Sequence, residues 1–285
     1  MLYVAALMSL GKVRVVLHRP ANADNLGAAA RVLKNFGLSR LAVVASPAWS
    51  GLPRSGGQGT ARDEIMLRAR KLARHASDLL ESAEFHADLP GALGPATWVC
   101  GTTSRDVEGR PRLSPRQLAA ELVARSAHGV VAVVFGEERR GLSDGELTYC
   151  QAVCTIPTSP AYDSMNLAQA VAVVSYEIAL AAGEPWSVIP GDGASPAGGP
   201  PAAPPPGAAS PAPPAAEPAR HATVEALWKK LEAVLGAAGY LNPQNPEAIL
   251  ADWRRLLSRA EPTQREVELL VAAARALERR LKLEP

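Results

Sequence analysis

Five short apolar runs, separated by segments of helical periodicity, constrain the fold of this chain more than any other feature. The runs are 13–17 (VRVVL), 40–46 (RLAVVAS), 97–103 (TWVCGTT), 129–136 (GVVAVVFG) and 152–157 (AVCTIP). Strands with almost no polar positions are buried on both faces, which is typical of a parallel sheet covered by helices. Helices are predicted over 25–37, near 64–75, 115–125 and 143–149, and over 166–182. The fold class is therefore predicted as α/β, with a parallel sheet and helices on both faces.

A proline-rich segment divides the chain. Residues 190–218 hold 11 of the 25 prolines and no run that could form a core. Such a segment is typical of a semi-extended tether. We therefore predict a front α/β domain (1–186), a Pro/Ala/Gly-rich linker (187–221) and a small all-α domain (222–285).

The tail is predicted to form three amphipathic helices. The first places Val224, Leu227, Leu231, Leu235 and Ala238 on one face. The second is predicted to start with Asn245 as N-cap and Pro246 at its first position, and the third with a capping box of Thr263 and Glu266. A bundle this small has little core of its own. We expect it to pack against the front domain or a second copy of itself.

Composition excludes some classes of protein. A net charge of +2 favours no partner class by itself, although 54–74 carries six Lys or Arg against two acidic residues. That stretch could follow a phosphate backbone, or it could be a solvated helix face. Three cysteines without a C-x-x-C pair favour buried reduced thiols, no metal site and a reducing cytoplasm. Residues 1–12 lack the basic start of a signal peptide and are too short to span a bilayer, so we expect an unstructured lead-in and no membrane role.

Four loops at the predicted carboxyl ends of strands are the candidate site, because ligands bind at that edge of open α/β sheets. They are 25–31 (NLGAAAR), 100–105 (CGTTSR), 135–142 (FGEERRGL) and 156–166 (IPTSPAYDSMN). No G-x-G-x-x-G or P-loop lysine is present. Gly27 is expected to let the backbone approach a ligand, and the helix start to offer N–H groups to an anion. In the alternative, Ser164 or Asn166 is a helix cap and the charged cluster is solvated.

Together the loops resemble the three motifs of the SPOUT superfamily of RNA methyltransferases, in its TrmH-type, ribose 2′-O-methylating branch. Asn25, Gly27 and Arg31 match the first motif, and Ser164, Asn166 and Leu167 match the third. The second motif is matched by Phe135, Gly136, Glu138, Gly141 and Leu142. The tail resembles the C-terminal extension of the TrmJ type, which methylates cytidine or uridine at nucleotide 32 in the tRNA anticodon loop. The chain departs from the family pattern at Asp163 and Met165.

The resemblance implies a SPOUT fold with a C-terminal trefoil knot, which is an exception to the rule that protein chains are unknotted. It also implies a homodimer, S-adenosylmethionine as cofactor and tRNA, not DNA, as substrate. The implied catalytic residues are Arg31, Asn25, Glu138, Ser164 and Asn166. The implied cofactor-binding residues are Thr102, Thr103, Ser104, Gly136, Ile156, Asp163, Ser164 and Met165. Arg31 could act as a base or as a clamp on phosphate and oxyanion; Asn25 and Glu138 would position it.

Three alternatives stay open. The chain could be a sister 2′-O-methyltransferase that acts on ribosomal RNA or on another tRNA position. It could be an RNA-binding SPOUT protein without catalysis. The tail could be a protein-interaction module, with Trp228 and Trp253 either in its binding face or in its core.

Overall fold

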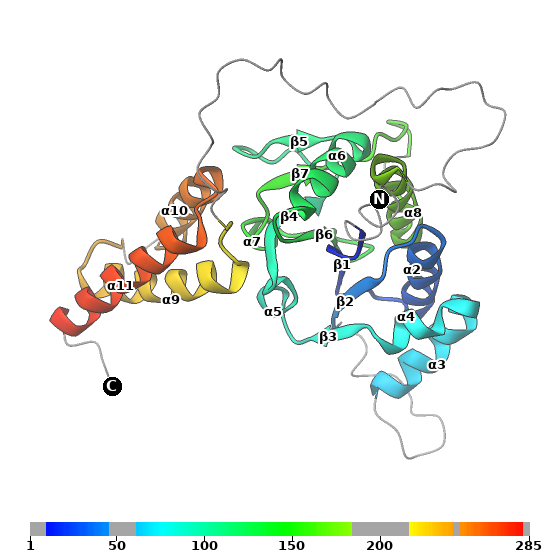
Figure 1. The fold of residues 1–285 in the computed structure, drawn as a ribbon, viewed down its shortest axis with the longest axis horizontal. Coiled ribbons are helices and arrows are strands. Elements are labelled where there is room, and N and C mark those ends of the chain that lie inside the picture. Colours follow the sequence, from blue (N-terminus) through cyan, green and yellow to red (C-terminus); the bar gives the residue numbers. More distant parts are fainter. Residues whose placement is uncertain (1–9, 46–60, 163, 184–216, 242–245, 282–285) are drawn as a thin grey trace.

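The computed structural model describes residues 10–45, 61–162, 164–183, 217–241 and 246–281, which form an α/β domain and a group of three helices (Figure 1). The strands are β1 (Val13–His18), β2 (Arg40–Val44), β3 (Glu84–His86), β4 (Ala96–Thr102), β5 (Arg112–Leu113), β6 (Val130–Phe135) and β7 (Ala152–Cys154). The front helices are α2 (Ala23–Asn35), α3 (Ala61–Ala73), α4 (Ser77–Glu81), α5 (Leu89–Leu93), α6 (Pro115–Ser126), α7 (Asp144–Leu147) and α8 (Leu167–Ala182). The tail helices are α9 (His221–Ala237), α10 (Pro246–Ala260) and α11 (Gln264–Leu281).

The strands form one seven-stranded sheet in the order β3-β2-β1-β6-β4-β7-β5, and every pairing between them is parallel. The five apolar runs became β1, β2, β4, β6 and β7, as predicted. The sequence did not predict the edge strands β3 and β5, which are short and not apolar. β3 is held by an ion pair between buried Arg14 of β1 and Glu84 at 2.7 Å.

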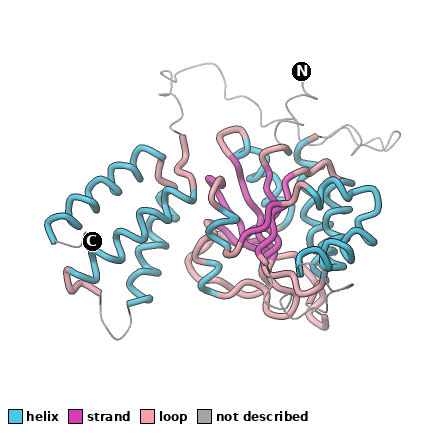
Figure 2. The backbone as a smooth tube through the Cα atoms, turned by 90° about the horizontal axis from the view of Figure 1, so that it is seen from below, coloured by secondary structure: helices cyan, strands magenta, loops and turns pink. Residues whose placement is uncertain are grey.

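Helices cover both faces of the sheet, as predicted, but unequally. Alternate residues of β1 separate the faces: Val13, Val15 and Leu17 pack in a cluster with α2, α3, α6 and α8. Val16 points to the other cluster, whose helical members come from the short α5 and α7. Figure 2 shows the strands inside the front domain and the three tail helices as a separate group. The thinly covered face leaves room for the tail.

The tail packs against the front domain. The backbone N–H of Ala222 donates to the carbonyl of Gly94 just before β4 at 3.2 Å, and Arg125 of α6 pairs with Glu261 at 2.9 Å. The tail's own buried cluster is small, with Ala219, Leu227 and Val267 at its centre. Docking therefore supplies contacts that three short helices cannot supply alone. This agrees with the expectation that the tail needs a partner surface.

Details of the tail agree with the sequence where they are described. Thr263 and Glu266 form the predicted capping box, and α10 begins at Pro246; Asn245 lies outside the described residues. Trp228 is buried, whereas Trp253 is exposed. Of the predicted apolar face of α9, Leu227 is buried but Ala238 is exposed.

The structure also bears on the predictions for the cysteines, the lead-in, the basic stretch and membrane spans. The three cysteines are free and buried, and burial raises the pKa of Cys150 and of Cys154 to about 12, so both stay protonated. Most of the lead-in lies outside the described residues, but its Leu10 is buried in the core and so is not part of an unstructured segment. In the basic stretch, Arg68 pairs with Glu64. No helix in the described ranges is both long and apolar enough to cross a bilayer.

The docked tail makes stability depend on pH through His221. Its ring is buried beside Tyr149 of the front domain, with centroids 5.5 Å apart. Burial lowers its pKa from 6.5 to about 4, although the nearby Glu225 carboxylate opposes the shift. The unfolded chain therefore binds this proton more tightly than the folded chain. The stability that neutral His221 contributes is complete above about pH 6.5 and falls by about 3 kcal/mol as the pH drops toward 4.

Urea unfolding of the wild type and of His221→Leu at about pH 7.5 and about pH 4.5 tests this. The leucine variant should lose about 2–3 kcal/mol less on acidification than the wild type. Other acid-sensitive groups, including His18, are present in both proteins and cancel in the comparison. Equal acid losses in the two proteins would contradict the assignment.

Candidate active site at the carboxyl edge of the sheet

The predicted loops meet because the strands that carry them are neighbours. β1, β6, β4 and β7 are adjacent in the sheet, and all run in the same direction. The register places Phe135 beside Leu17, and Thr102 beside Cys154. The segments after these residues therefore leave the sheet at one edge. The four loops thus lie together, as expected.

A cavity of about 350 Å³ lies among the loops that follow β4, β6 and β7. Its walls include Thr102, Thr103, Ser104, Gly136, Ile156, Ser164 and Met165, which are seven of the eight residues predicted to bind the cofactor. The eighth, Asp163, lies outside the described residues. Arg105, Glu137, Arg139 and Arg140 also line the cavity and were not predicted, although they belong to the quoted loops. The prediction favoured small residues over charged ones and so missed their contribution.

The loop after β6 is a tight turn that only glycine permits at two points. A Cβ atom on Gly136 would lie 2.3 Å from the carbonyl carbon of Gly141, which is far inside van der Waals contact. Gly141 has φ of +66°, in the left-handed region. Glu137 and Gly141 pair as a β-bridge across the turn. The turn presents Glu138 to the start of α2.

Glu138 binds the segment that leads from β1 into α2. One carboxylate oxygen accepts from the backbone N–H of Ala21 at 2.7 Å. The other accepts from the side-chain amide of Asn25 at 2.8 Å and from the N–H of Asn22 at 3.4 Å. A helix start attracts an anion. Here the carboxylate of Glu138 lies just before α2, but the two N–H groups that it binds belong to Ala21 and Asn22, which precede the helix, so anion binding by the helix start itself stays a prediction.

Asn25 extends the contact to the third motif. Its side-chain oxygen accepts from the amide nitrogen of Asn166 at 3.0 Å. Asn166 in turn caps α8, because its oxygen accepts from the N–H of Ala168 at 2.9 Å. One chain of hydrogen bonds, which we call the Glu138–Asn25–Asn166 relay, thus joins the three motifs. Asn166 is the helix cap, whereas Ser164 is exposed and lines the cavity.

Arg31 is placed differently from the other predicted catalytic residues. It lies on α2 and is exposed, and it lines neither the cavity among the loops nor the one beside His18. No other described residue bonds to its guanidinium. Asn25 and Glu138 bond to each other instead of to Arg31, so within one chain they do not position its side chain as predicted. Its catalytic role stays a prediction.

The structure corrects the expectation that Gly27 lets the backbone approach a ligand. A Cβ atom there would lie 2.0 Å from the carbonyl oxygen of Ala69 in α3. The close approach that glycine permits at this point is therefore between two helices, and not between backbone and ligand. The sequence could not show this, because the contact partner lies on a separate helix.

A second carboxylate, that of Glu146, binds a residue elsewhere on the carboxyl edge of the sheet and was not predicted from the sequence. Nε2 of His18, at the end of β1, lies 2.6 Å from Oε1 of Glu146 in α7. Burial lowers the pKa of His18, although the nearby Glu146 carboxylate opposes this shift. Burial tends to raise the pKa of Glu146, but hydrogen bonds from Ser143 and the nearby His18 outweigh burial, so the pKa of Glu146 is lowered as well. Glu146 is therefore ionised and His18 neutral, so Nε2 carries the proton. A cavity of about 510 Å³ lies beside this pair.

The arrangement can hold a medium-sized polar ligand. A volume of about 350 Å³ lies at the lower end of the range of small-molecule sites. Hydroxyl groups, backbone and apolar side chains line one part, while arginines and glutamates line another. Such a lining suits a molecule with an uncharged ring system at one end and charged groups at the other. In the described ranges, no three His, Cys, Asp or Glu side chains converge as a metal site would require.

Comparison with known proteins agrees with this geometry. The model of the SpoU rRNA Methylase family matches residues 12–176, and that of the tRNA methyltransferase TrmJ, C-terminal domain, matches residues 222–285. The chain belongs to the SpoU methylase family. It is therefore an RNA methyltransferase, and the resemblance to TrmH-type SPOUT enzymes of the TrmJ type is confirmed.

Individual relatives span nearly the whole chain. A tRNA (cytidine/uridine-2′-O-)-methyltransferase TrmJ of Cronobacter sakazakii is 32% identical over 92% of this chain and 94% of its own length. One of Klebsiella pneumoniae is 31% identical over 96% and 99%. The crystal structure of TrmJ from Z. mobilis ZM4 matches with a TM-score of 0.70 and 26% identity, over 93% of this chain and 98% of that one. Both the sheet domain and the helical tail thus have counterparts.

Gly27→Ala tests whether this glycine serves helix packing. The added methyl group must push α2 and α3 apart, so the free energy of unfolding should fall by about 1–3 kcal/mol. Gly236→Ala is the matched control, because Gly236 lies inside α9 and a methyl group there would meet no described atom within 4 Å. That variant should gain up to about 1 kcal/mol. Thermal and urea unfolding measure both. A Gly27→Ala protein of unchanged stability that fails to bind cofactor would contradict the packing role.

Proposed function

We propose that this enzyme methylates the ribose 2′-hydroxyl of cytidine or uridine at nucleotide 32 in the anticodon loop of tRNA, with S-adenosylmethionine as donor. The observation that carries the proposal is the Glu138–Asn25–Asn166 relay, which joins the three motifs beside a cavity lined by the second and third of them. The relatives named as tRNA (cytidine/uridine-2′-O-)-methyltransferases, matched over both domains, support the substrate class. Nucleotide 32 rests on the resemblance of the tail to the TrmJ type.

The cavity among the loops fits S-adenosylmethionine. When bound, this cofactor supplies a methyl carbon made electrophilic by a sulfonium. Its uncharged adenine suits the hydroxyl, backbone and apolar lining, and its charged amino-acid end suits the glutamates and arginines of the rim. The residues proposed to hold it are Thr102, Thr103, Ser104, Gly136, Ile156, Asp163, Ser164 and Met165. Ser164 and Asn166 would also shape the third loop.

Arg31 is the proposed catalytic cation. The 2′-hydroxyl is a weak nucleophile near neutral pH, so charge that develops on its oxygen must be stabilised or its proton removed. A guanidinium stays charged and can bind a phosphate through two parallel hydrogen bonds. Arg31 is exposed and its guanidinium bonds to no other described residue, so it is available to RNA. Glu138 and Asn25 would act by fixing the backbone at the start of the helix that carries it.

A homodimer would bring Arg31 of one subunit toward the cavity of the other. Small side chains along α8, with Tyr176 exposed on the same helix, support a close helix interface. The trefoil knot belongs to the same proposal: β7 and α8 would thread through a preceding loop. A cytoplasmic location follows from tRNA as substrate.

Arg31→Ala is expected to lower methyl transfer by at least about a hundredfold, because one charge stabiliser of the transition state is lost. Binding of S-adenosylmethionine should be unchanged, since Arg31 does not line the cavity. Arg40→Ala is a control, because Arg40 is exposed at the amino end of β2, on the opposite edge of the sheet. Single-turnover methylation and calorimetric cofactor binding measure the two effects. Normal turnover by Arg31→Ala would remove it from the mechanism.

The target nucleotide can be tested with the RNA itself. A tRNA transcript with 2′-deoxycytidine at nucleotide 32 offers no hydroxyl there and should accept no methyl group. The same transcript with a deoxynucleotide at position 34 is the control and should be methylated normally. Transfer of radiolabelled methyl groups measures both. Methylation of the first transcript would contradict nucleotide 32, and methylation of ribosomal RNA instead would favour the sister activity.

A further inference from the structure

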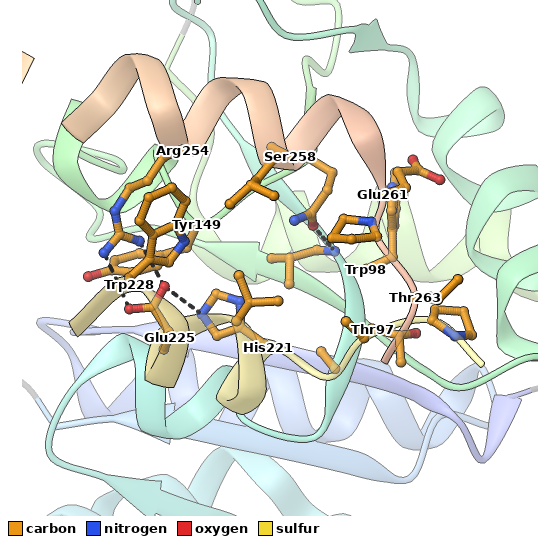
Figure 3. Close-up of a pocket in the computed structure, with 18 of the residues that line it drawn as sticks. Thr97, Trp98, Tyr149, His221, Glu225, Trp228, Arg254, Ser258, Glu261 and Thr263 are labelled. Atoms are coloured by element: carbon orange, nitrogen blue, oxygen red, sulfur yellow. Dashed lines mark hydrogen bonds and ion pairs between the residues drawn. The ribbon is translucent and has the colours of Figure 1, made fainter. Parts of the chain in front are cut away.

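A third cavity lies where the tail meets the front domain (Figure 3), with a volume of about 180 Å³. The front domain contributes the start of β4, the end of α6 and the residues just after α7, and the tail contributes α9 and α10. Its walls include Thr97, Trp98, Tyr149, His221, Glu225, Trp228, Arg254 and Ser258. We call this cavity the junction pocket. Nothing in the proposed methyl transfer uses it.

The charges around the junction pocket neutralise each other. Arg254 pairs with Glu225 at 2.7 Å, and its guanidinium carbon lies 5.0 Å from the centre of the Trp228 ring and 5.3 Å from that of Tyr149. On the other side, Arg125 lies over Trp98 at 5.0 Å and pairs with Glu261. Pocket walls of this kind favour an uncharged aromatic ring over a phosphate or an ammonium group.

Two buried polar atoms in the walls have no hydrogen-bond partner among the described residues. They are Nε2 of His221, whose residue is 7% exposed, and Oγ of Ser258. The Glu225 carboxylate is 3.9 Å from Nε2, which is too far for a hydrogen bond. Buried polar groups are almost always bonded, and both residues line the same cavity, where a ligand can supply the partners. A neutral imidazole and a hydroxyl can together bond to a ligand that has both a donor and an acceptor.

The volume and position of the junction pocket limit further which ligands it can bind. A cavity of about 180 Å³ exceeds the space of one water but is below the usual range for drug-sized molecules, so it suits one ring system. Thr97 lines the junction pocket and Thr102 lines the cofactor cavity, at opposite ends of β4. The strand between them separates the two cavities by about 17 Å. A ligand in the junction pocket cannot be the ribose that is methylated.

We propose that the junction pocket binds one unpaired nucleobase of the RNA substrate, at a nucleotide distant from the methylated one. A nucleobase is an uncharged ring with donors and acceptors on its edge, and RNA-binding proteins hold such bases by stacking and edge contacts. His221 and Ser258 bond to the edge, and the aromatic side chains pack against the ring. The inference rests on the proposed function in that the RNA bound here is the methylation substrate.

Ser258→Ala and His221→Leu test the pocket. If the two side chains serve a ligand, their removal should not lower the stability of the protein, whereas if they serve the fold, their removal should lower it. Removing an unpaired buried polar group should leave the melting temperature unchanged or raise it. Loss of a hydrogen bond to the base should weaken binding of a full-length tRNA transcript about five- to tenfold for each variant. Ser175→Ala is the control, since Ser175 of α8 is also buried with an unpaired hydroxyl but lies outside the pocket. Its affinity for tRNA should not change.

Affinity is measured by fluorescence anisotropy of full-chain protein at about pH 7.5, without cofactor, so it does not depend on methyl transfer. A scan of 2-aminopurine through the unpaired positions of the transcript then locates the base. One position should change fluorescence with the wild type and not with Ser258→Ala. Unchanged affinity in both variants, or parallel losses of stability and affinity, would overturn the inference. Absence of methylation at nucleotide 32, with the affinity pattern intact, would remove only the proposed target.

Discussion

The carboxylate of Glu138 is the interaction on which the candidate site depends. It accepts from two backbone N–H groups before α2 and from Asn25, and so ties the loop after β6 to the segment after β1. Because Asn25 also bonds to Asn166, the same charge fixes the entrance of α8. Glu146 has a corresponding role elsewhere on this edge, because it holds His18 at the end of β1. Two carboxylates thus fix segments at the carboxyl edge of the sheet: Glu138 lines the cavity proposed for the cofactor, and Glu146 lines the one beside His18.

β4 connects the two functional regions of the molecule. Its carboxyl end opens into the cofactor cavity, and its amino end meets the tail at Trp98. The tail can reach this place because α5 and α7, which cover that face of the sheet, are short. The proposed base contact at the tail and the proposed chemistry at the loops would therefore be linked through one strand of the central sheet, at a separation of about 17 Å. This geometry suits an RNA that is contacted at two distant nucleotides.

The sequence predicted what depends on local pattern. Continuous apolar runs identified the central strands, because burial on both faces leaves no polar position, and parallel direction placed the loops at one edge. Prediction failed where the cause lies far along the chain. Glu146 binds His18 128 residues away, and Gly27 meets Ala69 on a separate helix. The edge strands β3 and β5 were missed because their pairing comes from neighbours and not from their own residues.

Arg125 and Arg254 differ from Arg31 in the partners of their guanidinium groups. Arg254 and Arg125, at the junction, are each paired with a carboxylate and stacked on a ring, so their charge is used within the fold. The guanidinium of Arg31 bonds to no other described residue, and the helix that carries it is fixed at its start by Glu138. Binding an anion would restrict the side chain of Arg31, but its charge is not already neutralised by a carboxylate of the described fold. That contrast supports the proposal that the phosphate contact is made by Arg31, and it gives Arg125 and Arg254 a structural role.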